Sequence, residues 1–105
     1  MTKSLTQAAM FYFVKKKYSV YEEIGLKRRG KLRADLVAFN FKQEFITIEV
    51  KSCWQDYTSD TKWVDYIEFC DKMYFCISYH LWESKHGKTI KEDVKAHGVG
   101  IMVLM

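Results

Sequence analysis

Two carboxylates and a lysine lie in the middle of the chain, at positions where strand geometry would gather them. Asp35 falls in the apolar segment 34–41, and Glu49 and Lys51 fall in the segment 45–51. Both segments are rich in β-branched and aromatic residues, and a short polar break separates them. This pattern predicts a β-hairpin that carries all three charged side chains.

The register of the hairpin decides whether the carboxylates meet. Strand side chains alternate, so Glu49 and Lys51 share one face and the isoleucines and valine between them form the core face. A turn centred on Lys42 pairs Asp35 with Glu49 to within one residue. Opposed like charges destabilise a sheet, so a compensating charge is needed. A divalent cation would supply it, because hard cations bind carboxylate oxygens; the alternative is a solvated polar face with a modest salt bridge to Lys51.

The composition is that of one globular domain. The 105 residues, 49% of them hydrophobic, can form one core but leave no room for a second. No apolar run is long enough to cross a membrane, and the N-terminus lacks the order of a signal peptide, so we expect a cytoplasmic protein. Three cysteines without zinc-ligand spacing support neither a disulfide framework nor structural zinc, and we expect reduced, mostly buried thiols.

A basic segment directly precedes Asp35. The net charge is only +4, but five cations cluster around a glycine. They are Lys27, Arg28, Arg29, Lys31 and Arg33. Such a segment could neutralise phosphates of a nucleic acid. The alternative is a solvated turn, and the position beside Asp35 is what favours DNA.

The remaining elements would position this hairpin. Ser4 to Gln7 has the form of a capping box, which predicts that a helix starts there and ends at the lysines 15–17. Its apolar stripe consists of Leu5, Ala8, Ala9, Tyr12 and Phe13. A first strand at 18–24 ends near two glutamates, Glu22 and Glu23, one of which should face the side of Asp35.

The second half of the chain alternates polar connections with apolar elements. We expect a polar connection at 52–59 and a helix capped by Ser59 or Asp60, with an apolar stripe formed by Trp63, Tyr66, Ile67 and Cys70. The further expected elements are a doubly buried strand at 73–79, an irregular segment at 80–88, a helix at 89–97 stopped by Gly98, and a strand at 99–104.

The order α, β, β, β, α, β, with Asp35 on the second strand and Glu49-Val50-Lys51 on the third, resembles the PD-(D/E)XK nuclease superfamily. The resemblance implies an α/β fold with a restriction-endonuclease-like αβββαβ core, a mixed central sheet flanked by helices, and here an extra C-terminal helix and strand, all in a single domain over residues 1–105. The chain departs from the superfamily motif in having Ala34 where the motif has proline.

Further segments are similar to the MmcB-like DNA-repair family, which belongs to the same superfamily. The likeness covers roughly residues 20–104. The matching segments are Arg33-Ala34-Asp35-Leu36, Ile48-Glu49-Val50-Lys51-Ser52, Asp60-x-Lys62-Trp63, Asp65-Tyr66 and Cys70-Asp71-Lys72-Met73-Tyr74-Phe75.

The resemblance implies roles for individual residues. Asp35 and Glu49 would bind Mg²⁺ or Mn²⁺, with the Val50 carbonyl as a backbone ligand, and Lys51 would position or deprotonate the attacking water. Either Glu22 or Glu23 would add an acidic ligand. Weaker candidates for contacts to phosphate or to the ligands themselves are Gln55, Asp56 and Lys62.

Two functions remain open at this point. The first is a metal-dependent DNA nuclease, acting in repair, recombination or the processing of mobile-element or phage DNA. The second is a non-catalytic DNA-binding or assembly module that keeps the nuclease fold. The intact Asp35, Glu49 and Lys51 favour the nuclease, whereas the small size favours the binding module or a homodimer.

Overall fold

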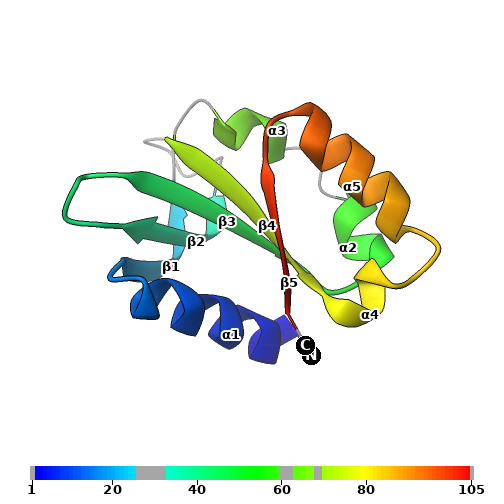
Figure 1. Ribbon diagram of the computed structural model, residues 1–105, viewed down its shortest axis with the longest axis horizontal. Helices are drawn as coiled ribbons and strands as arrows, with labels where there is room; N and C mark the ends of the chain where they lie inside the picture. Colours follow the sequence, from blue (N-terminus) through cyan, green and yellow to red (C-terminus); the bar gives the residue numbers. More distant parts are fainter. Residues whose placement is uncertain (1, 26–32, 60–62, 68–69, 105) are drawn as a thin grey trace.

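The chain folds around one five-stranded sheet in the order β1-β2-β3-β4-β5 (Figure 1). The computed structural model describes residues 2–25, 33–59, 63–67 and 70–104. β1, β2 and β3 pair antiparallel, whereas β3, β4 and β5 pair parallel, so the sheet is mixed. Helices flank it on both faces, and the expected mixed α/β architecture is therefore confirmed.

The strands lie close to where the periodicity predicts them. Three of them differ from the expected ranges by one residue at one or both ends, β2 ends two residues early, and β3 has the expected range. Their bounds are β1 Ser19–Gly25, β2 Arg33–Phe39, β3 Phe45–Lys51, β4 Lys72–Ser78 and β5 Gly100–Leu104.

The helices agree less well with expectation. The connection expected at 52–59 contains helix α2, and the segment expected to be irregular begins with α4. Both are one-turn or two-turn helices, too short for an apolar stripe to be recognised. The helix bounds are α1 Thr2–Lys15, α2 Trp54–Ser59, α3 Trp63–Tyr66, α4 Tyr79–Trp82 and α5 Gly87–Ala96.

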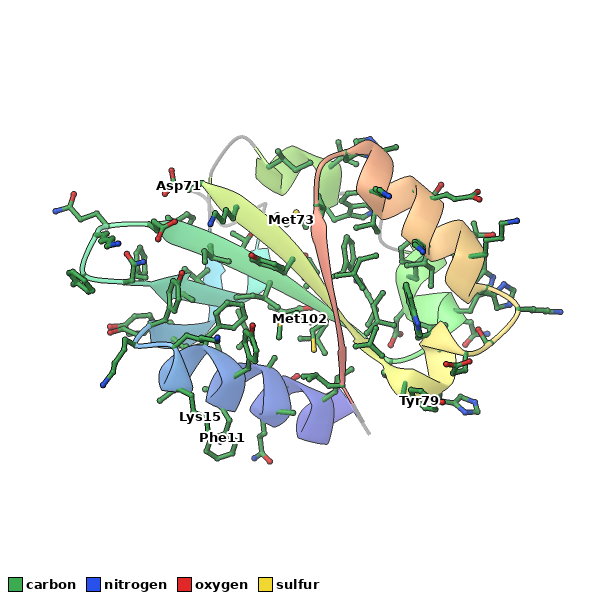
Figure 2. The ribbon with its side chains drawn as sticks, in the orientation of Figure 1. Phe11, Lys15, Asp71, Met73, Tyr79 and Met102 are labelled. Atoms are coloured by element: carbon green, nitrogen blue, oxygen red, sulfur yellow. The ribbon has the colours of Figure 1, made fainter. Side chains whose placement is uncertain are left out.

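Helix α1 covers one face of the sheet, and Leu5, Ala9 and Phe13 bury its apolar stripe. The stripe is narrower than predicted, because Tyr12 is exposed. Phe11 and Lys15 project from α1 away from the sheet (Figure 2). Since the helix begins at Thr2, the predicted capping box at Ser4 is wrong.

The end of α1 is set by backbone geometry. Lys17 has a φ of 72°, and the N–H of Tyr18 donates to the Phe13 carbonyl at 3.0 Å. The rings of Phe13 and Tyr18 meet edge to face, with 5.5 Å between their centroids. A left-handed residue followed by an apolar contact back to the last turn is a common way to stop a helix. This stop directs the chain into β1.

The opposite face of the sheet carries a second core. α2, α4 and α5 gather over the β3–β5 side (Figure 1), and Phe75 and Ile77 of β4 pack there with Ile90 and Val94 of α5. β4 is thus buried on both faces, as predicted, because Cys76 belongs to the core under α1. Met102 of β5 also packs on the α1 side, as Figure 2 shows.

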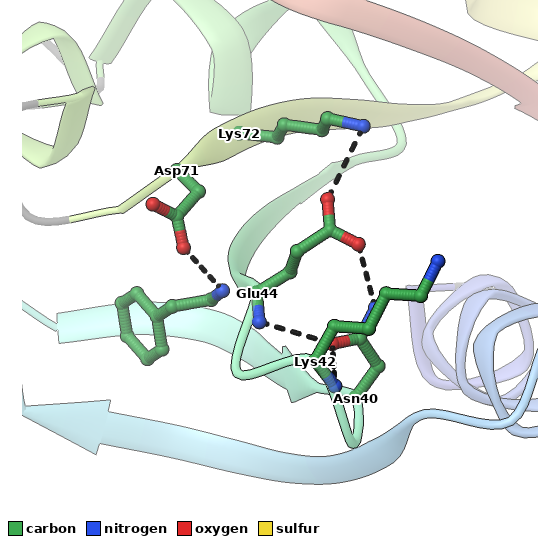
Figure 3. A network of polar contacts seen from close by, with 6 residues as sticks. Asn40, Lys42, Glu44, Asp71 and Lys72 are labelled. Carbon is green, nitrogen blue, oxygen red and sulfur yellow. Dashed lines mark hydrogen bonds and ion pairs between the residues drawn. The ribbon is translucent and has the colours of Figure 1, made fainter.

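The β2–β3 turn is held by a polar network at its base (Figure 3). The Asn40 Oδ1 accepts the N–H groups of Lys42 and Glu44, and its Nδ2 donates to Glu44 at 2.6 Å. Glu44 also pairs with Lys72 at 3.5 Å. Local side-chain bonds of this kind are what asparagine supplies in turns, and they fix the register of the hairpin.

Candidate metal and nucleic-acid site

The hairpin register brings Asp35 and Glu49 together. Leu36 pairs with Ile48 and Phe39 with Phe45, which is the register predicted from a turn centred on Lys42. Two residues related by this register lie directly opposite on the same face of the sheet. The side chains of Asp35 and Glu49 therefore project from directly opposite positions on neighbouring strands, on the same face of the sheet.

Two hydrogen bonds cross between these positions. The Val50 N–H donates to Asp35 Oδ2 at 2.8 Å, and the Asp35 N–H donates to Glu49 Oε2 at 3.4 Å. Each carboxylate is thus held by a backbone donor of the other strand. Backbone N–H groups that donate to carboxylate oxygens offset negative charge, so the backbone compensates part of the repulsion that two opposed carboxylates would otherwise cause.

The site is buried. Glu49 is 2% exposed and Lys51 is 7% exposed, whereas Asp35 is partly exposed. The alternative of a solvated polar face is therefore wrong. Thr47, on the same face of β3, is also buried, so both faces of this strand are covered. Burying charged groups costs free energy unless they are paired and hydrogen-bonded. Solvent reaches the site at Asp35, because this residue is partly exposed.

The end of β3 is tied to β4 beside the site. The Ser78 hydroxyl donates to the Ser52 carbonyl at 3.1 Å and accepts the Leu81 N–H at 3.2 Å. One buried serine therefore joins the residue after Lys51 to the first turn of α4. The sequence analysis did not select Ser78, and a serine before a short apolar run gives only a weak capping signal. This bridge fixes the backbone that carries Lys51.

The β1–β2 register separates the two glutamate candidates. Glu22 pairs with Leu36 and shares the face covered by α1. The next position, Glu23, lies opposite Asp35 in the same antiparallel register. Of the two glutamates that the sequence left open, the backbone register therefore favours Glu23 as the one on the side of Asp35.

The predicted phosphate contacts are only partly within the described residues. Lys27, Arg28, Arg29, Lys31 and Lys62 lie outside them. The backbone of Arg33 begins β2, two residues before Asp35. Gln55 and Asp56 are exposed on α2, the helix that follows Lys51. Asp56 accepts a hydrogen bond from Ser52 at 3.4 Å. α2 thus presents polar side chains directly after the site.

The donor set fits a hard divalent cation. Within the part of the chain that the structure describes, no group of three or more His, Cys, Asp or Glu side chains could hold a metal ion. Asp35 and Glu49 supply two carboxylates, and Mg²⁺ is usually held by one or two carboxylates together with water and phosphate. A cation here would thus take its remaining ligands from water, substrate or backbone.

The three cysteines are not among the candidate site residues, and they differ in solvent exposure. Cys53 is exposed, Cys70 is partly buried and Cys76 is buried. Burial raises the pKa of the Cys76 thiol to about 12. The expectation of a buried thiol is therefore wrong for Cys53.

The comparisons with known proteins agree with this α/β architecture. A protein of unknown function from Silicibacter pomeroyi superimposes with a TM-score of 0.68 at 28% sequence identity, over 72% of this chain. The chain spans about half of that protein, 51% of its length. No curated protein matches. No helix among the described residues is long and apolar enough to cross a membrane. A family model described as DNA repair protein MmcB-like matches residues 2–100, which confirms that resemblance, and the chain belongs to the MmcB-like DNA repair family.

Proposed function

We propose that the protein is a metal-dependent deoxyribonuclease that hydrolyses phosphodiester bonds, built on a restriction-endonuclease-like core. The observation that supports this most is the placement of Asp35 and Glu49 opposite each other, with Lys51 two residues along the same buried face. Membership of a DNA repair family supports DNA as the substrate.

The three side chains would divide the work. Asp35 and Glu49 would hold Mg²⁺ or Mn²⁺ together with the Val50 carbonyl. The metal would lower the pKa of a bound water and stabilise the charge that develops on the phosphate. Lys51, which is buried, would position the attacking water and offset negative charge.

The arrangement of neighbouring elements supports access of a phosphate from one side. Asp35 is the partly exposed member of the site, and Arg33 begins the same strand two residues earlier. The sequence between β1 and β2 carries the other four clustered cations. A basic sequence that leads into the strand of Asp35 supports a phosphate ligand at this site.

The test is cleavage of single-stranded, duplex and branched DNA in Mg²⁺ or Mn²⁺. Asp35→Asn and Lys51→Met each keep the size of the side chain, and each should lower the cleavage rate at least a hundredfold. Glu92→Gln and Lys91→Met change exposed residues of α5 and serve as matched controls that should cut normally.

Two outcomes would overturn the nuclease. Wild type that binds DNA in either metal and never cuts it would identify a non-catalytic DNA-binding module. Cleavage that survives in Asp35→Asn and Lys51→Met would assign the activity to a contaminant or to another site.

A further inference from the structure

A row of aromatic rings crosses three strands on the face that carries the carboxylates. Phe39 of β2 and Phe45 of β3 are paired residues, and their ring centroids are 4.9 Å apart. Tyr21 of β1 lies on the other side of Phe39, at 6.1 Å. Side chains two apart on a strand share a face, so Phe39 lies on the same face as Asp35.

Two of the three rings are accessible to a ligand. Tyr21 is 51% exposed and Phe39 is 39% exposed. The helices α2, α4 and α5 gather toward the β3–β5 side of the sheet, away from β1 and β2 (Figure 1). Exposed apolar patches of this kind mark binding surfaces more often than chance.

The composition of the patch favours planar ligands. On β1, β2, β3 and the turn between β2 and β3, the exposed large hydrophobic side chains of the described residues are all aromatic: Tyr21, Phe39 and Phe41. The ammonium group of Lys42 lies 6.0 Å from the centre of the Phe41 ring. Aromatic rings beside cations are the usual surface on which single-stranded nucleic acids stack their bases.

The charges around the patch also suit a polyanion. Glu44 and Asp71 lie beside the patch, but Glu44 pairs with Lys72 and Asp71 accepts the Phe45 N–H at 2.7 Å. The sequence between the strands that carry Tyr21 and Phe39 contains four cations, Lys27, Arg28, Arg29 and Lys31, and Arg33 begins β2. A strand of nucleic acid laid along β2 would run from the level of Asp35 to that of Phe39.

We propose that Tyr21, Phe39 and Phe45 form a base-stacking platform that selects single-stranded DNA and leads it to the Asp35–Glu49 pair. The four steps along the strand from Asp35 to Phe39 span roughly 13 Å, at about 3.3 Å per residue. Bases in a duplex are already stacked on each other, so the platform would discriminate against duplex DNA. This inference rests on the proposed nuclease function for its substrate, but the binding surface can be tested without cleavage.

The binding test uses a fluorescent twelve-nucleotide oligothymidine and a duplex of equal length, in EDTA, followed by anisotropy. Tyr21→Ala and Phe39→Ala should each weaken single-strand binding about five- to tenfold, with little change for duplex, because each removes one stacked base contact. Tyr21→Phe keeps a ring and should bind like wild type. Phe11→Ala removes a 68% exposed ring on the outer side of α1 and is the control.

A second measurement needs no variant. Irradiation of wild type with an oligonucleotide that contains 5-iododeoxyuridine should attach DNA to the peptides carrying Tyr21 or Phe39. Adducts confined to other peptides, or unchanged single-strand affinity in both alanine variants, would overturn the platform. So would a change in sedimentation showing that Tyr21→Ala or Phe39→Ala dissociates a dimer, because the patch would then be a protein interface.

The two proposals fail separately. If Glu49→Gln abolishes cleavage and leaves the anisotropy unchanged, and Tyr21→Ala and Phe39→Ala lose single-strand binding, both stand. If wild type never cuts DNA but the alanine variants lose single-strand binding, the platform stands and the nuclease falls. If cleavage requires Glu49 while both rings are dispensable for binding, the nuclease stands and the platform falls.

Discussion

The two ends of the β2–β3 hairpin both carry carboxylates, but in opposite settings. At the turn, Glu44 pairs with the exposed Lys72 and with Asn40, four residues away in sequence. At the other end, Asp35 and Glu49 come from different strands, and Glu49 is almost completely buried. The turn therefore places its acid at the surface beside a cation, whereas the far end buries Glu49 and leaves Asp35 partly exposed.

We propose that this difference separates a structural charge, at Glu44, from a functional one, at Glu49. An exposed ion pair contributes little and costs little. A buried carboxylate carries a large desolvation cost, which neighbouring groups only partly offset. The turn end of the hairpin is held by the Asn40 hydrogen bonds and the Glu44–Lys72 pair, without a buried charge. The proposed metal binding would give the buried Glu49 a role beyond folding.

The largest difference between the two ends is expected when one glutamate at each end is neutralised. Glu49→Gln should lower cleavage at least a hundredfold and should abolish stabilisation by Mn²⁺, because a ligand raises Tm only when it binds the folded state. Glu44→Gln should keep both. The measurements are cleavage rate and Tm with and without Mn²⁺. Equal loss in both variants would mean that the two ends do not differ in function.

The two faces of β3 offer a second contrast, between a buried apolar side chain and a buried carboxylate. Ile48 is fully buried under α1, next to Glu49 in sequence. Ile48→Ala should lower the free energy of unfolding by about 2–5 kcal/mol, from lost burial and the cavity left behind. Glu49→Gln should reverse the pattern, with a large loss of activity and a smaller loss of stability. Urea denaturation measures the first effect.

The control for Ile48 is Val14→Ala, since Val14 is exposed on α1 and its truncation should change stability by less than about 0.5 kcal/mol. Cleavage by Ile48→Ala, measured well below its Tm, should remain close to wild type per folded molecule. A loss of activity as large as that of Glu49→Gln would show that the α1 face also shapes the site.

Sequence reasoning predicts the hairpin best because several signals agree there. Alternation in 45–51, a polar break and the symmetric placement of Asp35 and Glu49 around Lys42 all specify one register, and the structure has that register. What the alternation could not show is that both faces of β3 are buried. α1 and α2 contact β3, and Tyr57 of α2 is in turn bonded to Asp93 of α5, 36 residues away in sequence.

The short helices show the other limit. α2 and α4 contain too few residues for a helical stripe, and their polar residues are typical of loops. α4 is stabilised by the Ser78 cap, and α2 by a hydrogen bond from Tyr57 to Asp93, 36 residues away. Such contacts depend on the tertiary fold, and a local pattern does not contain them.

A smaller effect on stability is expected at the contact between α5 and α2, the helix that follows the buried end of the hairpin. The Tyr57 hydroxyl donates to Asp93 at 3.0 Å, and burial together with this carboxylate raises the pKa of Tyr57 above its ordinary value of 10.0. Tyr57→Phe keeps the ring and should lower stability by about 1 kcal/mol. Asp93→Asn, which keeps an acceptor, is the matched comparison.

The sign of the pH dependence follows from the raised pKa. The unfolded chain ionises Tyr57 first, so its stabilisation is complete below pH 10 and is lost as the pH rises from 10 toward the folded pKa. The difference in unfolding free energy between wild type and Tyr57→Phe should shrink over that range. A difference that stays constant above pH 10 would show that the hydroxyl does not hold α2 on α5.

The smallest expected effect belongs to the turn end. The hydrogen bond from Asn40, and then the charge of Lys72, lower the pKa of Glu44 below its ordinary value of 4.5. Its stabilisation is therefore present above pH 4.5 and is lost as the pH falls through the folded pKa. Glu44→Gln should lower Tm slightly at pH 7, less so in high salt, and the difference should vanish in acid. A Tm difference that persists in acid and high salt would mean that Glu44 acts by packing, and its contrast with the buried Glu49 would no longer be one of exposed against buried charge.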